Sequence, residues 1–188
     1  MTQFEYLAIA YSLVISFAVV RAASVLPHVL ESERGYWVHT VWVLGNLVTS
    51  LLIFWNFWSY REVEWTLGRF ALVLTLPTAL YVLASILAPD DPGQIQSWRR
   101  HYYSVRVRFF VTGIAYFVVI LMVSTFVLDM PILDPFRLVQ LPFLGVAVAG
   151  ALSDRPAVHS GLASLVIAAF VILVARSFAA PGPLWSVQ

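Results

Sequence analysis

The chain has 188 residues, of which 61% are hydrophobic and 11% charged, and its mean hydropathy is +0.85. Soluble domains are about 45–50% apolar and about 25% charged, so this composition excludes a soluble globular domain and a disordered chain. The net charge of +1 gives no bulk attraction to nucleic acid, and we expect no nucleic-acid partner. Cysteine and lysine are absent, which excludes disulfides, thiolate metal sites and lysine Schiff-base chemistry.

Six apolar stretches are each long enough to cross a bilayer, which takes about 20 mostly apolar residues in a helix. They cover about residues 4–26, 36–60, 66–88, 109–128, 135–152 and 157–179. Asp134 precedes Pro135 and Asp154 lies just before Pro156, the acid-then-proline pattern of a helix start. Most connections are short, which favours antiparallel neighbours. The sequence therefore predicts an all-α membrane protein with a single domain over residues 1–188, a bundle of six transmembrane helices in three antiparallel hairpins.

The distribution of arginine predicts how the bundle is oriented. An even number of spans places both termini on one side of the membrane. The connections after the first, third and fifth stretches carry most of the arginines, namely Arg34, Arg99, Arg100, Arg106, Arg108 and Arg155. Because basic residues collect on the cytoplasmic side, we expect a bacterial inner (plasma) membrane protein with both termini outside the cytoplasm.

The second stretch carries a stripe of polar residues on an otherwise apolar helix. His39, Asn46, Thr49 and Asn56 follow at steps of 7, 3 and 7 residues, which keeps them within an arc of roughly 100°. Such a stripe is expected to face protein or water rather than lipid. It indicates hydrogen bonding between helices, the more common case, or alternatively the lining of a hydrated path.

Three further polar residues are expected at the same depth as His39. Arg21 lies near the end of the first stretch, and His159 and Ser160 lie near the start of the sixth. If the first, second and sixth helices adjoin, these residues form one polar cluster. Because histidine titrates near physiological pH, the cluster could sense or pass protons; the alternative is a purely structural histidine.

Other polar and helix-distorting residues suggest local roles. Glu5 opens the first stretch, and Arg69 and Arg176 are its candidate ion-pair partners at the same side of the membrane. These arginines could equally extend their charged ends to the head groups. Pro77 lies in the middle of the third stretch and predicts a helix kink, which serves either gating or packing.

The one long connection contains a predicted basic amphipathic helix over about residues 95–108, just before the fourth stretch. Its apolar residues follow at steps of 4, 3 and 4 and share one face: Trp98, Tyr102, Val105 and Phe109. Its arginines fall away from that face: Arg99, Arg100, Arg106 and Arg108. This pattern predicts an interfacial helix whose arginines bind anionic lipid head groups. The alternative, a site for a phosphorylated ligand, lacks a glycine-rich cradle.

Residues for catalysis or metal binding are sparse in the sequence. The interiors of the six stretches contain no Asp or Glu, and no His/Asp/Glu cluster has the spacing of metal ligands. No GxSxG, GxGxxG or HExxH motif occurs. We therefore expect no metal and no cofactor, and the sequence favours a protein without enzymatic activity.

Several short phrases resemble a family of small multi-span bacterial membrane proteins whose function is not known. They are Phe4-Glu5-Tyr6-Leu7, Trp37-Val38-His39 with Trp42, Glu64-Trp65-Thr66, and the stretch from His101-Tyr102 to Phe109-Phe110. The resemblance covers mainly the first 110 residues. It implies a free-standing membrane protein of about this length and implies no activity, and it draws attention to Glu5, His39, Glu64 and Trp65.

Three functional hypotheses are consistent with these patterns. The first is a homo-oligomeric channel or transporter for an ion or small solute, which suits short loops and little mass outside the membrane. The second is a non-catalytic accessory subunit or sensor of a larger membrane complex, which suits the lack of intramembrane acids. The third is an intramembrane enzyme acting on lipid or quinone. In each case we expect the lipid bilayer and either a second copy or another membrane protein as partners.

Overall fold

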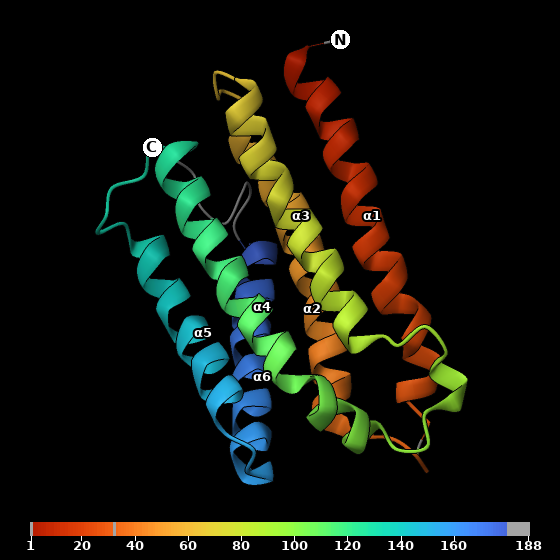
Figure 1. Cartoon of the computed structure of the whole chain (residues 1–188). Helices are drawn as coiled ribbons and strands as arrows, with labels where there is room; N and C mark the ends of the chain where they lie inside the picture. The colour runs from red at the N-terminus through yellow and green to blue at the C-terminus, as the bar shows by residue number, and fades with distance from the viewer. Residues whose placement is uncertain (1, 32, 180–188) are drawn as a thin grey trace.

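The computed structural model describes residues 2–31 and 33–179, and this part of the chain contains helices and short connections but no strand. The elements, shown in Figure 1, are α1 (Gln3–Val29), α2 (Trp37–Asn56), η1 (Phe57–Tyr60), α3 (Leu67–Leu87), η2 (Pro92–Gln94), α4 (Trp98–Phe126), α5 (Pro135–Leu152) and α6 (Pro156–Ala179). The expected all-α architecture is therefore confirmed.

Five of the helices in the described residues are long and apolar enough to cross a membrane: α1, α2 with η1, α3, α4 and α6. The remaining helix, α5, has 18 residues. At 1.5 Å per residue it measures about 27 Å, slightly less than the hydrocarbon core of about 30 Å. The structure thus supports a multi-pass membrane protein with five clear spans and a shorter sixth apolar helix.

Side-chain caps set the starts of several helices. Thr2 and Glu5 form a capping box at α1, in which each side chain binds the backbone N–H of the other residue. Thr66 and Ser97 accept backbone hydrogen bonds at the starts of α3 and α4. These small polar residues satisfy N–H groups that have no partner within the helix.

The helices pack around α2. Helices α1, α3, α4 and α5 follow one another in a curved layer, while α2 packs against α1 and α3, and α6 packs against α2 and α5. Consecutive helices run in opposite directions (Figure 1). We call the end of the bundle where α4 and α6 begin the Trp98 end, and the opposite end, where α1 begins, the Thr2 end.

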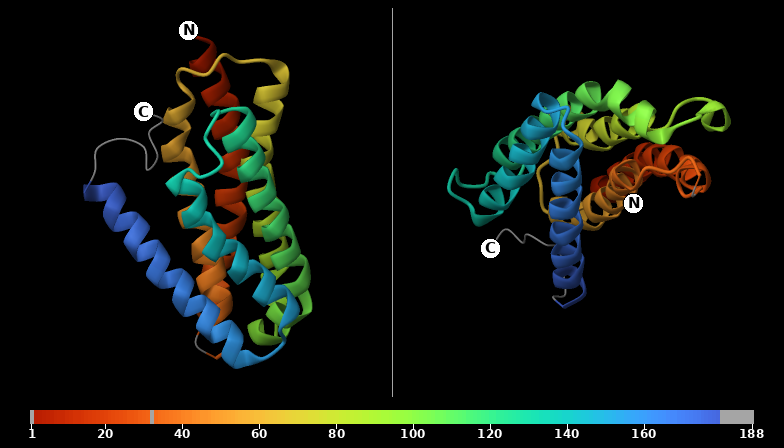
Figure 2. Two further views of the ribbon diagram at one scale, coloured as in Figure 1. Left: turned by 90° about the vertical axis from the view of Figure 1, so that its left-hand side faces the viewer. Right: turned by 90° about the horizontal axis from the view of Figure 1, so that it is seen from below.

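Helix α6 is the least enclosed element. Among its described side chains, the buried ones all lie between His159 and Val166, in its first half. Figure 2 shows α6 inclined away from the other helices as it approaches the Thr2 end. The second half contributes only half-buried residues such as Phe170 and Leu173 to the interior.

The basic segment predicted over about residues 95–108 is helical from Trp98 onward. Residues 98–108 form the first turns of a continuous α4, which begins after the Ser97 cap and runs to Phe126. No Gly or Pro separates Trp98 from Phe109, so nothing interrupts the helix where the membrane span begins. The predicted apolar face is buried against protein, whereas Arg99, Arg100 and Arg108 are exposed.

The start of α4 is attached to the connection between α1 and α2. The backbone N–H of Trp98 donates to the carbonyl of Arg34 at 3.2 Å. Its indole N–H donates to the carbonyl of His28 at 2.9 Å. Trp98 is 1% exposed, so both hydrogen bonds are enclosed within the bundle.

Candidate functional site

Two groups of residues in the bundle interior could have a function beyond packing. The first, which we call the histidine cluster, lies at the Trp98 end and consists of His39, Trp98, His101, Tyr102 and His159. The second is an apolar chamber closer to the middle of the bundle. The two groups differ in how well their polar atoms are paired.

His39 lies at the centre of the histidine cluster and is completely buried. Its ring stacks on Trp98 with the centroids 5.0 Å apart, and the edge-on ring of His101 lies 5.6 Å away. Neither ring nitrogen of His39 has a hydrogen-bond partner in the described part of the chain. The nearby carbonyl of Leu87 accepts a hydrogen bond from Nε2 of His101 at 3.2 Å. His39 is therefore held mainly by aromatic packing.

His159 is fully paired. Its Nε2 donates to the carbonyl of Ser153 at 2.8 Å, and its Nδ1 accepts from the hydroxyl of Tyr102 at 2.8 Å. This pairing suits the neutral ring with its proton on Nε2. Phe110 stacks on the ring with the centroids 5.8 Å apart. The arrangement makes His159 an anchor that ties the start of α6 to α4 and to the α5–α6 connection.

Arg106 strengthens the same junction. One of its guanidinium nitrogens donates to the carbonyls of Gly150, Ala151 and Ser153 at the end of α5. The final carbonyls of a helix have no partner within it and carry partial negative charge, so an arginine there is stabilising. Arg106 thus joins α4 to α5 within the bundle, whereas a role at the lipid head groups was expected.

The expected cluster of Arg21, His39, His159 and Ser160 is brought together only in part. The rings of His39 and His159 both lie near the ring of Tyr102 on α4, with centroids 6.2 Å and 5.3 Å from it. Arg21 instead donates to Asp90 at 2.6 Å and to the carbonyl of Ala88 at 2.9 Å, at the end of α3. Ser160 is half-buried beside His159.

The polar stripe of α2 faces the bundle interior. His39, Asn46 and Asn56 are buried, and Thr49 is half-buried. The amide of Asn46 donates to the carbonyl of Leu80 on α3 at 3.1 Å, which joins two helices. The amide of Asn56 donates within its own helix, to the carbonyl of Leu52 at 2.6 Å. At Asn46 the stripe therefore joins α2 to α3.

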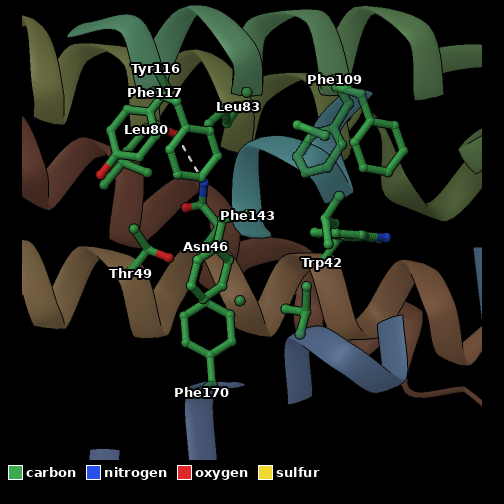
Figure 3. A pocket seen from close by; sticks show the side chains of 16 residues that line it. Trp42, Asn46, Thr49, Leu80, Leu83, Phe109, Tyr116, Phe117, Phe143 and Phe170 are labelled. Carbon is green, nitrogen blue, oxygen red and sulfur yellow. Dashed lines mark hydrogen bonds between the residues drawn. The ribbon is translucent and has the colours of Figure 1, made fainter. Parts of the chain in front are cut away.

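Two adjoining pockets of about 110 Å³ and 170 Å³ form the chamber. They share five lining residues: Thr49, Tyr116, Phe117, Phe143 and Phe170. Figure 3 shows the smaller pocket, with the ring of Phe170 reaching from α6 toward α2 and Phe143, and with Tyr116 and Thr49 on the side away from Trp42. The larger pocket continues to residues near the Thr2 end, such as Asn56, Tyr60 and Leu128.

The chamber contains polar atoms that have no hydrogen-bond partner within the described part of the chain. Tyr11, Tyr116 and Gln140 line the larger pocket and are 0%, 6% and 8% exposed. Neither hydroxyl, and neither polar atom of the Gln140 amide, has a hydrogen-bond partner among the residues that the structure describes. The carbonyl oxygen of Asn46 in the smaller pocket is likewise unpaired there. Buried polar groups are normally paired, so these atoms require an explanation.

Sequence reasoning did not identify Tyr11 or Tyr116, and Gln140 attracted no functional role. One signal could have found Tyr116, because tyrosine normally lies at the membrane–water boundary. Tyr116 lies well inside the fourth apolar stretch, where the boundary offers no partner for its hydroxyl. Gln140 is similarly an amide inside an apolar stretch.

The predicted ion-pair residues are placed differently from the expectation. Glu5 binds the backbone N–H of Thr2 in the capping box. The guanidinium of Arg69 lies 3.7 Å from the carboxylate of Asp129 and donates to the carbonyl of Glu64. Arg176 is exposed in the last turns of α6.

Helix α3 continues through Pro77, which is buried. Thr78 donates its hydroxyl hydrogen to the carbonyl of Leu74 at 2.8 Å, and Thr75 donates to the carbonyl of Leu72 at 2.5 Å. Both contacts lie in the turn that Pro77 disturbs, where the missing N–H frees a backbone carbonyl.

No group of three His, Asp or Glu side chains within residues 2–31 and 33–179 is arranged to hold a metal ion. Comparison with known proteins gives no match to a family model, to a curated protein or to a solved structure. The chamber and the histidine cluster are therefore the features of this chain that bear on its function.

Proposed function

We propose that this chain is a small transport protein that takes an uncharged solute into the chamber and carries it across the membrane. The observation that supports this function most directly is the chamber itself. It combines apolar walls with unpaired polar atoms from Tyr11, Tyr116 and Gln140. Binding sites for small molecules are typically apolar cavities with a few convergent polar groups.

The lining favours an uncharged solute over an ion. None of the described residues that line either pocket is charged. Ion pathways through membranes normally contain ionisable residues or rings of carbonyl groups, because a bare ion is costly in hydrocarbon. Of the two solute classes that the sequence left open, the neutral one fits this cavity better.

The arrangement of α6 offers a means of access. The helix is fixed at its start by His159 and contributes Phe170 and Leu173 to the chamber wall. Its second half is inclined away from the bundle (Figure 2). A swing of α6 about its anchored end would widen or narrow the chamber, a hinge motion of the kind that opens many binding sites.

For the membrane topology we propose six spans in three antiparallel hairpins within the bacterial inner membrane, with both termini outside the cytoplasm. This places the Trp98 end in the cytoplasm, where the exposed Arg99, Arg100 and Arg108 would meet anionic head groups. The length of α5, 18 residues, is close to that of the hydrocarbon core. A reporter that is active only in the cytoplasm, fused after α6, should give no signal; a strong signal would contradict the orientation.

A homo-oligomer, or an accessory role beside another membrane protein, is supported by two open glycine surfaces. A methyl group added at Gly145 on α5 or at Gly161 on α6 would meet no described atom within 4 Å. Small residues allow close approach of a second helix in membranes. The mass of the protein in mild detergent separates these cases, because a discrete multiple of the chain supports the homo-oligomer and co-purifying subunits support the accessory role.

Solute flux into proteoliposomes tests the transport function. We expect uptake of one or more uncharged solutes from a panel of urea, glycerol, a hexose and a phenol, above that of protein-free liposomes. Thr49→Phe should reduce this uptake at least about tenfold, because the ring would fill the space that both pockets share. Thr75→Phe on the exposed side of α3 is the matched control. Uptake no faster than in protein-free liposomes for every solute would overturn the proposal.

A further inference from the structure

We infer that the chamber binds a neutral lipid whose head is a single oxygenated ring, such as a quinone or quinol. The inference rests on the proposed function and specifies its solute. It assigns Tyr11, Tyr116 and Gln140 to the oxygens of the ring, and Phe117, Phe143 and Phe170 to its faces.

The unpaired polar atoms define what the head group must offer. They come from three helices, since Tyr11 belongs to α1, Tyr116 to α4 and Gln140 to α5. All three side chains line the larger pocket. A phenol hydroxyl and an amide can each donate and accept a hydrogen bond. The set can therefore bind either the carbonyl oxygens of a quinone or the hydroxyl groups of a quinol.

The walls of the chamber favour a flat ring over an acyl chain. The rings of Phe117 and Phe143 are stacked at an angle of 23°, with their centroids 6.3 Å apart. Phe143 and Phe170 are also 6.3 Å apart. Aromatic rings prefer offset or edge-on contact with other rings at such separations. A planar head group would thus contact the faces and edges of aromatic rings on several sides.

The volume and the charge of the chamber agree with this head group. A cavity of about 150 Å³ lined by apolar side chains is sufficient to bind benzene. The larger pocket, about 170 Å³, therefore accommodates one substituted ring, and the adjoining pocket of about 110 Å³ leaves room for substituents. No charged residue lines the chamber in the described part of the chain, so a charged ligand would have no ion-pair partner there.

The apolar tail of such a lipid would leave the chamber beside α6. Phe170 and Leu173 form this side of the larger pocket and are only half-buried. The neighbouring residues Val171 and Ile172 are exposed on the outside of α6, 63% and 60%, where lipid would surround them. The tail would follow this wall from the ring site to the acyl region of the bilayer.

Equilibrium binding of a decyl-substituted benzoquinone to the full chain in lipid nanodiscs tests the inference, with quenching of tryptophan fluorescence as the readout. Trp42 lines the chamber and would report a bound quinone. We expect saturable quenching, weakened about tenfold or more by Tyr116→Phe and by Gln140→Leu, because each removes a hydrogen bond to the ring. Tyr103→Phe, whose hydroxyl lies 3.3 Å from that of Tyr36 at the Trp98 end, is the matched control and should bind as the unmodified protein does.

Other measurements separate this ligand from its alternatives. Thr49→Phe, which leaves the polar groups in place but fills the shared space, should also abolish saturable quenching, so the test does not depend on one variant folding. Displacement of the quinone by decanol at equal concentration would show that only the tail is recognised and would overturn the inference. Quenching that does not saturate, with no effect of any variant, would show a chamber that holds water alone. Flux of urea or glycerol without quinone binding would refute the quinone inference and leave the transport proposal standing. Quinone binding without flux of any solute would support the binding site and refute the transport proposal.

Discussion

The hydroxyl of Tyr102 on α4 lies 2.8 Å from Nδ1 of His159 on α6, and both side chains are completely shielded from solvent. The other nitrogen of the same imidazole binds the carbonyl of Ser153. One ring thereby connects α4, the α5–α6 connection and α6. Because α6 diverges from the bundle beyond Val166, this junction provides the principal polar attachment of the last helix.

Tyr102→Phe tests this junction. The substitution removes the hydroxyl and leaves Nδ1 of His159 buried without a donor, which should lower the free energy of unfolding by about 1–3 kcal/mol. Thermal and denaturant unfolding in mild detergent measure the change. Tyr6→Phe is the control, because Tyr6 is 60% exposed and its replacement should have an effect within about 0.5 kcal/mol. Equal stability of the two variants would contradict the structural role of the hydrogen bond.

Gly150→Ala should destabilise the contact between α4 and α5. A methyl group at Gly150 would overlap the ring of Phe110, which also stacks on His159. Such overpacking costs about 1–3 kcal/mol. At Gly145 of the same helix there is open space, so Gly145→Ala should be neutral or stabilise by up to about 1 kcal/mol through helix propensity. The reversed order of stability for the two variants would show that the ring of Phe110 does not lie against Gly150.

Arg106→Gln should destabilise more than Arg100→Gln, although both remove one positive charge. Arg106 is half-buried and donates to carbonyls at the end of α5, whereas Arg100 is exposed. Hydrogen bonds from a charged group are worth about 1.5–3 kcal/mol, and an exposed arginine contributes about 0–1 kcal/mol. Unfolding in detergent at two salt concentrations measures the contribution of each arginine to the free energy of unfolding. A larger effect of Arg100→Gln would favour head-group binding as the main role of this basic segment.

His39→Phe tests whether His39 has a role in the histidine cluster beyond packing. The ring of His39 is buried, stacks on Trp98 and makes no hydrogen bond with the described residues, so an apolar ring of similar shape should keep the stability within about 1 kcal/mol. The same variant is then assayed for solute flux. Preserved stability with lost flux would identify His39 as a functional residue; preserved stability with unchanged flux is the result expected of a packing residue.

The helix ends were the most predictable part of the fold. Pro135 and Pro156 begin α5 and α6 close to the expected positions, since a proline in the first turn has no N–H that the helix requires. The basic helix predicted over about residues 95–108 and the fourth apolar stretch form one helix in the structure, which begins at Trp98. Arginines on the exposed side of a helix do not end it, and α4 passes from Arg108 to Phe109 without a break.

The candidate site was less predictable, because its residues come from different helices. Arg21 illustrates the difficulty: its partner Asp90 is 69 residues away, and only the packing of α1 against α3 brings the two together. The chamber likewise depends on the depths of Tyr11, Tyr116 and Gln140 in three helices. Periodicity identifies the inward face of one helix, as it did for Asn46, but it contains no information on which helix that face meets.

The two hydrogen bonds of Trp98 have a consequence for assembly during synthesis. Their acceptors, the carbonyls of His28 and Arg34, belong to a segment that leaves the ribosome more than sixty residues before Trp98. Chains fold from the N-terminus onward as they are made. The first helix pair is therefore made before the fourth helix, and we expect a defect at the α1–α2 connection to disturb the seating of Trp98 and hence the insertion of α4.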